Sequence, residues 1–140
     1  MKIKLTLVIQ EIEEASEAYT IFYDTKEGKT VYLPDEFVTG ERGTMLEDLI
    51  ENNHSRFLRF PDKYEIHEYS IMEQYIDWLP CGRAKTELSS AICGGKGAFR
   101  RFKATLRYHG LEQQWYDFKA EALREMAIRW CEENGLEVEE

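Results

Sequence analysis

Strand-forming and helix-forming segments are separated along this chain of 140 residues, and that separation is the strongest constraint on its fold. Segments rich in aromatic and β-branched residues lie within the first 60 positions. From Asp62 onward the apolar residues recur at three- and four-residue spacing, which is typical of amphipathic helices. Strands followed by helices predict an α+β fold, in which a small antiparallel sheet packs against a mainly helical C-terminal half.

The early segments predict a hairpin and a third strand. Residues 19–23 and 30–33 are aromatic and β-branched, and the residues between them include Gly28, which suits the positive φ of a turn. Residues 56–60 alternate charged and apolar side chains, as a half-buried strand does. Residues 5–15 have the apolar spacing of one helical face and predict a helix, with a strand as the alternative.

Two capping patterns mark the starts of helices. Thr44 stands three residues before Glu47, as in a capping box, and predicts a short helix that ends near Asn53. Asp62 and Glu65 have the same spacing. We therefore expect Asp62 to cap a second helix, with the Glu65 side chain reaching back to the start of that helix.

Proline and glycine stop signals divide the C-terminal half into four predicted helices. The four helices span residues 62–79, a short segment around 88–92, residues 97–109 and residues 112–134. Their predicted buried residues are Tyr69, Met72, Ile76 and Leu79, then Leu88, Ala91 and Ile92, then Phe99, Phe102 and Leu106, and finally Trp115, Phe118, Ala122 and Met126. Tyr116, Trp130 and Tyr108 lie off these stripes. Residues 136–140 are predicted to be a frayed acidic tail.

The composition predicts one folded domain over residues 1–140, because 43% of the residues are hydrophobic and no linker-like segment interrupts them. No apolar run reaches the length of a membrane span, and residues 1–9 are too short an apolar stretch for a signal peptide. We therefore expect a cytoplasmic protein. Its three cysteines have no paired spacing. Cys93 and Cys131 are predicted to be buried thiols, and Cys81 to be exposed.

Positive charge is concentrated in one segment of an otherwise acidic chain. The formal net charge is −9, yet residues 96–109 contain five basic residues and no acid, which leaves −14 on the rest of the chain. The basic residues are Lys96, Arg100, Arg101, Lys103 and Arg107. This asymmetry is the main indication of function in the sequence.

The basic segment predicts a surface that binds a polyanion. A helix that starts after Gly94–Gly97 offers free N–H groups and a partial positive charge to an anion, and the glycines allow close approach. Arg100, Lys103 and Arg107 share one helical face, with Tyr108 beyond them, which suits the phosphates and bases of a single-stranded nucleic acid. The candidate contact residues are Gly95, Lys96, Gly97, Arg100, Arg101, Lys103, Arg107 and Tyr108.

Other uses of the basic helix remain open. Its charges could pair with carboxylates of the same chain, or the helix could dock on an acidic protein partner or on a second copy in a homodimer. No metal-ligand spacing and no nucleophile with a positioned histidine occur, so we expect no metal site, no cofactor and no catalytic residues. An enzyme that acts on a small anionic substrate at residues 94–96 is the third hypothesis.

Three blocks of the chain resemble uncharacterised protein family 0158, a group of small bacterial proteins. The blocks are Phe60–Glu73, Gly95–Lys103, and Trp115–Phe118 with Ala127 and Trp130–Gly135. Together with the hairpin they cover most of the chain, and the middle block is quite specific. The resemblance implies a bacterial cytoplasmic protein without an assigned activity, and it provides no family catalytic residue to carry over.

Overall fold

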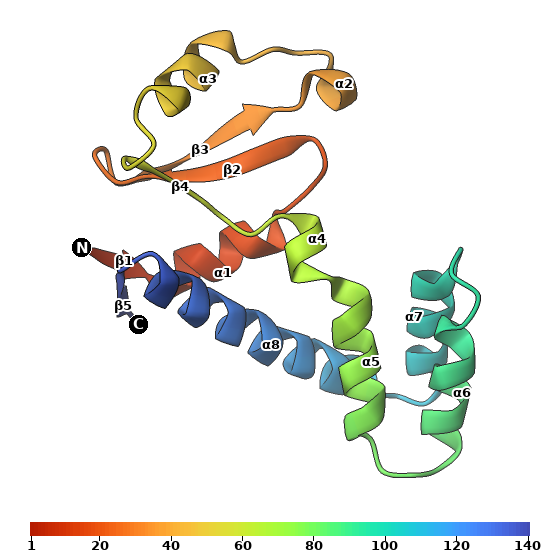
Figure 1. Ribbon diagram of the computed structural model, residues 1–140. Helices are drawn as coiled ribbons and strands as arrows, with labels where there is room; N and C mark the ends of the chain where they lie inside the picture. The colour runs from red at the N-terminus through yellow and green to blue at the C-terminus, as the bar shows by residue number, and fades with distance from the viewer. The chain divides into compact units, whose positions relative to one another are not determined.

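The computed structural model describes residues 1–140 and has the α+β fold expected from the sequence, with a three-stranded antiparallel sheet early in the chain (Figure 1). The chain divides into two compact units. Unit 1 comprises Met1–Ile66 and Leu123–Glu140, and unit 2 comprises His67–Ala122. Because spatial compactness does not measure folding cooperativity, the single-domain interpretation stays a prediction. No helix in the chain combines the length and the apolar character that crossing a bilayer requires.

The sheet of unit 1 contains the predicted hairpin and third strand. Strands β2 (Tyr19–Asp24) and β3 (Lys29–Pro34) are antiparallel neighbours, and β4 (Phe57–Arg59) pairs with the other edge of β2. The hairpin turn is held by Asp24, whose carboxylate accepts hydrogen bonds from the backbone N–H groups of Lys26 and Glu27. The local turn chemistry therefore fixes the register of the hairpin.

The chain termini meet in a second, two-stranded sheet of unit 1. Strand β1 (Lys2–Lys4) pairs in parallel with β5 (Glu137–Glu139), and helix α1 (Leu5–Glu13) follows β1 directly. The helix predicted for residues 5–15 is therefore confirmed. The expectation of a frayed tail over residues 136–140 is corrected, because Leu136 is buried and anchors the segment that pairs with β1. A tail of mostly acidic residues is ordered by backbone pairing, which composition does not reveal.

Two short helices follow the hairpin in unit 1. Helix α2 (Glu36–Thr39) was not predicted, and α3 (Thr44–Glu51) matches the predicted short helix. The predicted capping role of Thr44 is corrected: Gly43 is the N-cap residue and no side chain caps this helix. A Cβ at Gly43 would lie 3.0 Å from Cδ of Pro34, so a side chain at this position would crowd the end of β3.

The helix predicted over residues 62–79 is broken at His67. The break separates α4 (Lys63–Ile66) from α5 (Glu68–Trp78), and His67 adopts a left-handed conformation with φ +49°. The predicted capping box is confirmed, because Glu65 N–H donates to the Asp62 carboxylate and Asp62 N–H donates to the Glu65 carboxylate. No glycine or proline announces the break, so periodicity alone predicted one helix.

Trp130 is central to the core of unit 1. Helix α8 (Glu112–Glu133) carries Trp130 near its end, and the indole stacks on the Phe60 ring with 4.4 Å between centroids. The indole N–H also donates to the carbonyl of Arg59 at 2.8 Å. Its predicted position off the buried stripe is corrected. The buried face in the second half of α8 is formed by Leu123, Ala127, Trp130 and Cys131, whereas Met126 is only half-buried.

Unit 2 is built from α5, α6 (Arg83–Ile92), α7 (Ala98–Tyr108) and the first half of α8. Tyr75 lies at the centre of its aromatic core, with ring centroids of Phe102, Trp115 and Phe118 within 6.3 Å. The Tyr75 hydroxyl donates to the Gln114 side chain, and burial raises the pKa of that hydroxyl. The predicted inward positions of Phe102, Leu106 and Trp115 are confirmed.

Three side chains predicted to be buried in unit 2 are corrected to exposed positions. Phe99 is 38% exposed, because its ring lies at the border between the buried and the cationic faces of α7. Tyr69 is partly exposed and uses its hydroxyl to hydrogen bond the carbonyl of Ile92. Cys93 is exposed just after the end of α6, and its thiol donates to the carbonyl of Ser89. Cys131 is buried and Cys81 is exposed, as predicted.

Candidate anion-binding surface on helix α7

A glycine-rich loop connects α6 to α7 in unit 2. Gly94, Gly95 and Gly97 have φ values of +90°, +67° and +81°, a region that strongly favours glycine. Ala98 N–H donates to the carbonyl of Gly95, so the loop closes as a tight turn directly before α7. Lys96 is exposed at the loop. The sequence predicted this glycine-rich loop before the helix, and the structure shows that the positive φ values of the loop require the glycines.

Arg101 holds the loop in place. Its guanidinium donates to three backbone carbonyls, those of Ala91, Cys93 and Lys96, each at 2.8 Å. Two of these carbonyls lie at the C-terminal end of α6, where helical carbonyls lack partners within their own helix and the helix dipole favours a cation. The structure therefore places Arg101 apart from the other basic residues of α7, because each of its three nitrogens already donates a hydrogen bond within the fold.

The remaining basic side chains lie along the outer face of α7. Arg100, Lys103 and Arg107, which we call the cationic row, are spaced at i, i+3 and i+7 on one side of the helix. Arg107 has Glu112 as an ion-pair partner at 3.5 Å. Neither Arg100 nor Lys103 forms an ion pair, and Lys96 forms none in the loop. Of the five basic residues, only Arg107 therefore has a carboxylate partner. Arg101 is bound by carbonyls, and Lys96, Arg100 and Lys103 have neither kind of partner.

Aromatic rings lie on both sides of the cationic row. The Lys103 ammonium lies 4.8 Å from the centroid of the partly exposed Phe99 ring, within the range of a cation–π contact. Tyr108, at the end of α7, is 73% exposed and packs edge-on against the imidazole of His109. The sequence predicted Tyr108 as a contact residue. Phe99 was missed, because its three-residue spacing from Phe102 matched the buried stripe.

An open groove lies between α6 and α7, beside the cationic row. The cavity has a volume of about 470 Å³ and is lined by Arg83, Thr86, Glu87, Ser90, Ala104, Thr105 and Tyr108. Glu87 hydrogen bonds His109 and pairs with Arg83, and these two contacts, the His109 hydrogen bond first, lower the pKa of the Glu87 carboxyl. Glu87 and His109 are 22 positions apart, so nothing in the sequence indicated this pair.

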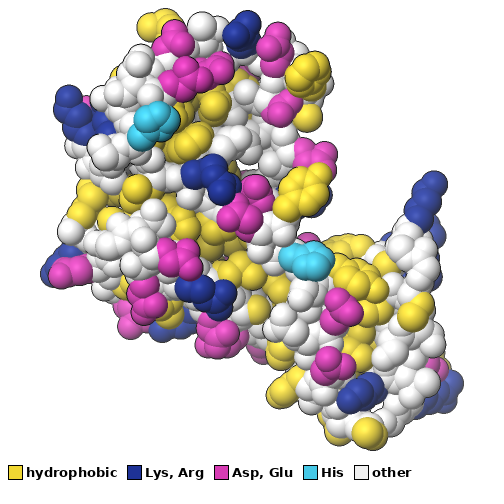
Figure 2. All heavy atoms as spheres, viewed as in Figure 1, with side chains coloured by type: hydrophobic (Ala, Val, Ile, Leu, Met, Phe, Trp, Pro, Cys, Tyr) yellow, Lys and Arg dark blue, Asp and Glu magenta, His cyan; other side chains and the backbone are white.

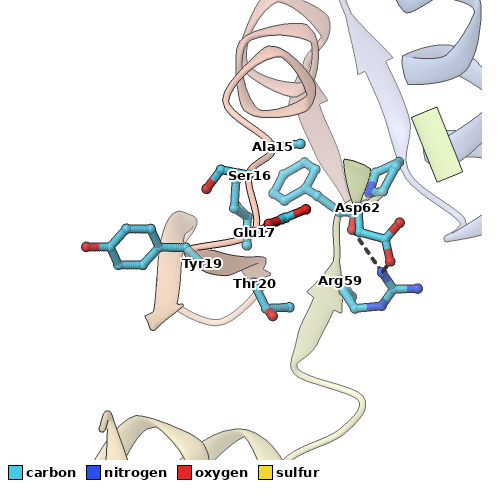
Figure 3. Close-up of a pocket in the computed structure, with 10 residues that line it drawn as sticks. Ala15, Ser16, Glu17, Tyr19, Thr20, Arg59 and Asp62 are labelled. Carbon is cyan, nitrogen blue, oxygen red and sulfur yellow. Dashed lines mark hydrogen bonds and ion pairs between the residues drawn. The ribbon is translucent and has the colours of Figure 1, made fainter. Parts of the chain in front are cut away.

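A smaller cavity of about 260 Å³ lies in unit 1, between the start of β2 and the end of β4 (Figure 3). Arg59 lies at its wall and pairs with Asp62 and Glu65. The Arg59 guanidinium, aided by the Asp62 N–H, lowers the pKa of the Glu65 carboxyl. Figure 3 shows the Tyr19 ring directed away from Arg59 and Asp62. Of the lining residues, Arg59 and Asp62 are already engaged at the start of α4.

The two units differ in charge. Unit 2 contains eight lysines and arginines against seven acidic residues, whereas unit 1 contains ten against twenty. No group of three or more histidine, cysteine, aspartate or glutamate side chains is arranged to hold a metal ion. The surface of α7 therefore combines positive charge without carboxylate partners, accessible aromatic rings and a glycine-rich loop before the helix N-terminus.

Comparisons with known proteins agree with the resemblance seen in the sequence. The model of an uncharacterised protein family (UPF0158) matches residues 1–139, including the N-terminal segment that the sequence blocks did not cover. UPF0158 protein PA5073 of Pseudomonas aeruginosa is 28% identical over 136 residues, which are 95% of this chain and 86% of that relative. No solved structure matches the chain.

Proposed function

The chain belongs to the uncharacterised protein family UPF0158, and we propose that it is a non-enzymatic module that binds a polyanion, specifically a single-stranded nucleic acid, through α7. The observation that carries the proposal is the set of unneutralised cations Lys96, Arg100 and Lys103 beside the exposed Phe99 and Tyr108 rings. Phosphates would contact the cations, and bases would stack on the rings.

Two features of α7 support this assignment over a purely structural role for its charges. Arg101, which does have a structural role, is engaged by three carbonyls, whereas the neighbouring Arg100 forms no such bond. A helix that needed its charges only for folding would engage Arg100 in a similar way. Holding like charges at i and i+3 on one face instead costs a few tenths of a kcal/mol, and an anionic ligand would offset that repulsion.

The acidic remainder of the chain shapes the expected binding. Unit 1 repels a polyanion, so association should be modest in strength and confined to α7, unlike binding by a protein that is basic throughout. The number of phosphates contacted should be three or four, which predicts a slope of log affinity against log salt of about −2 to −3 for a single strand.

The test uses two polyanions that differ in whether they carry bases. Fluorescence anisotropy at low salt would measure binding of a labelled single-stranded oligonucleotide and, by competition, of inorganic polyphosphate. We expect both to bind, and we expect Tyr108→Ala to weaken the oligonucleotide about fivefold or more while leaving polyphosphate unchanged, because stacking requires a base. If neither polymer binds at the lowest salt, the proposal is overturned.

A further inference from the structure

Helix α2 presents apolar side chains to solvent in an ordered conformation. Phe37 is 99% exposed and Val38 is 57% exposed. The helix is held by its own cap, because the Asp35 carboxylate accepts the N–H groups of Phe37 and Val38 at 2.9 and 3.2 Å. A Phe side chain exposed to water contributes nothing to the core, and aromatic side chains of this kind are enriched at protein interfaces.

Acidic residues surround this apolar helix. Residues 35–51, which we call the acidic surface, contain six acidic side chains and one arginine. On α3, within the same segment, Met45 is 89% exposed and Leu49 is also exposed. Figure 2 shows hydrophobic and acidic side chains mixed over α2 and α3. A partner for this surface must therefore provide positive charge together with a place for an aromatic ring.

The chain itself carries a surface of that kind. Residues 96–109 hold five basic residues and no acid, and the α6–α7 groove beside them has a volume of about 470 Å³, enough for a phenyl ring. Ala104, the ring of Tyr108 and the methyl group of Thr105 provide apolar walls. Arg100 stands one helical turn before Ala104, where its charge can meet a carboxylate of the acidic surface.

We propose that the acidic surface of one copy docks on α7 of a second copy, with Phe37 in the α6–α7 groove. The contact joins two different patches, and every copy carries both of them. It regulates the proposed function, because the acidic surface and the polyanion compete for the same cations. The inference rests on the assignment of α7 as the binding surface, but self-association is measured without any polyanion.

The test is analytical ultracentrifugation of the full chain at low salt over a range of concentrations. We expect the average mass to rise above 16.5 kDa with concentration and to return to it at high salt. Phe37→Asp, and separately the double variant Arg100→Glu with Lys103→Glu, should each weaken self-association about tenfold or more. Tyr64→Asp is the matched control, because Tyr64 is a highly exposed aromatic residue of unit 1 (82%) outside the acidic surface, and this change should leave the masses unchanged.

Mixing the two disrupted variants gives the decisive result. Phe37→Asp retains an intact α7 and the double variant retains an intact acidic surface, so the mixture should form a one-to-one pair of twice the monomer mass. A mass of 16.5 kDa at every concentration, or variants that remain separate when mixed, would overturn the docking. If polyanion binding persists in either case, the proposed function stands without this regulation. Loss of polyanion binding with self-association intact would overturn the proposed function alone.

Discussion

Arg101 donates its Nε–H to the carbonyl of Ala91 at 2.8 Å, ten positions earlier in the chain. This bond joins the first turn of α7 to the last turn of α6 and positions the glycine loop between them. The next residue toward the N-terminus, Arg100, is directed to solvent and has no carboxylate partner. Two adjacent arginines therefore have different roles, one in folding and one in the proposed contact with a polyanion.

The two arginines should separate stability from binding. Arg101→Ala removes three hydrogen bonds from a charged donor and should lower the free energy of unfolding by about 2 kcal/mol or more. Arg100→Ala should leave that free energy within about 0.5 kcal/mol of wild type and weaken oligonucleotide binding. Urea unfolding and anisotropy on both variants make the comparison. Equal stability of the two variants would contradict the role assigned to Arg101.

The glycine at the start of α7 should resist substitution. A Cβ at Gly97 would lie 2.9 Å from Nη1 of Arg101, and φ there is +81°, so Gly97→Ala should cost about 1–2 kcal/mol of unfolding free energy. Gly82→Ala is the control, because no atom lies within 4 Å of its Cβ position. Thermal unfolding should show a lower Tm for Gly97→Ala and little change for Gly82→Ala; similar shifts would argue against the packing of Arg101 on Gly97.

The ion pair of Asp24 should make stability depend on acid pH. The Arg56 guanidinium, aided by the N–H groups of Glu27 and Lys26, lowers the pKa of the buried Asp24 carboxyl from 3.8 to about 2. Because the folded-state pKa is depressed, the stabilisation is present above pH 4 and is lost as the pH falls toward 2. Asp24→Asn should therefore lower the unfolding free energy by about 2 kcal/mol at pH 7 and by roughly half as much at pH 3.

Urea titrations of wild type and Asp24→Asn at both pH values measure this difference. Asp48→Asn is a suitable control, because Asp48 forms no ion pair and should give the same small effect at pH 7 and pH 3. A cost for Asp24→Asn that is constant across the pH range would mean that the carboxylate is not stabilised by Arg56 in the folded protein.

The cysteines should react in two classes. Cys81 and Cys93 are exposed, whereas Cys131 is buried, and burial with the nearby Glu132 carboxylate raises the pKa of the Cys131 thiol. A disulfide reagent added to the native protein should modify two thiols quickly and the third only after denaturation. Cys93→Ser should remove one of the fast-reacting thiols. If only one thiol of the native protein reacts quickly, Cys93 would be buried, as the sequence predicted.

Local features of the sequence were sufficient for the hairpin and for the extent of α7. Gly28 and the aromatic strands around it specify the turn without reference to distant residues, and Phe102 with Leu106 fixes the buried side of α7. The break at His67 was missed, because a histidine at φ +49° has no compositional signal. Trp130 is buried because it stacks on Phe60, seventy residues earlier in the chain, and the spacing of residues within one helix cannot predict that contact.

The sequence predicted the charge of the candidate site, but not the hydrogen bonds of its basic side chains or the groove beside them. Five basic residues without an acid stand out in the sequence, as does the glycine loop before them. Which of the five face solvent depends on the carbonyls left open at the end of α6, and only the folded arrangement brings Arg101 to them. The α6–α7 groove likewise depends on the packing of two helices, which no spacing within either helix specifies.

The salt dependence of oligonucleotide binding tests the central claim most directly. We would compare wild type, the double variant Arg100→Ala with Lys103→Ala, and a control, Lys26→Ala with Lys29→Ala, which removes the same charge from the β2–β3 hairpin of unit 1. Loss of two phosphate contacts should reduce the slope of log affinity against log salt by roughly 1.4 in the α7 variant, and the control should keep the wild-type slope. Equal slopes for all three proteins would contradict the assignment of α7 as the binding surface.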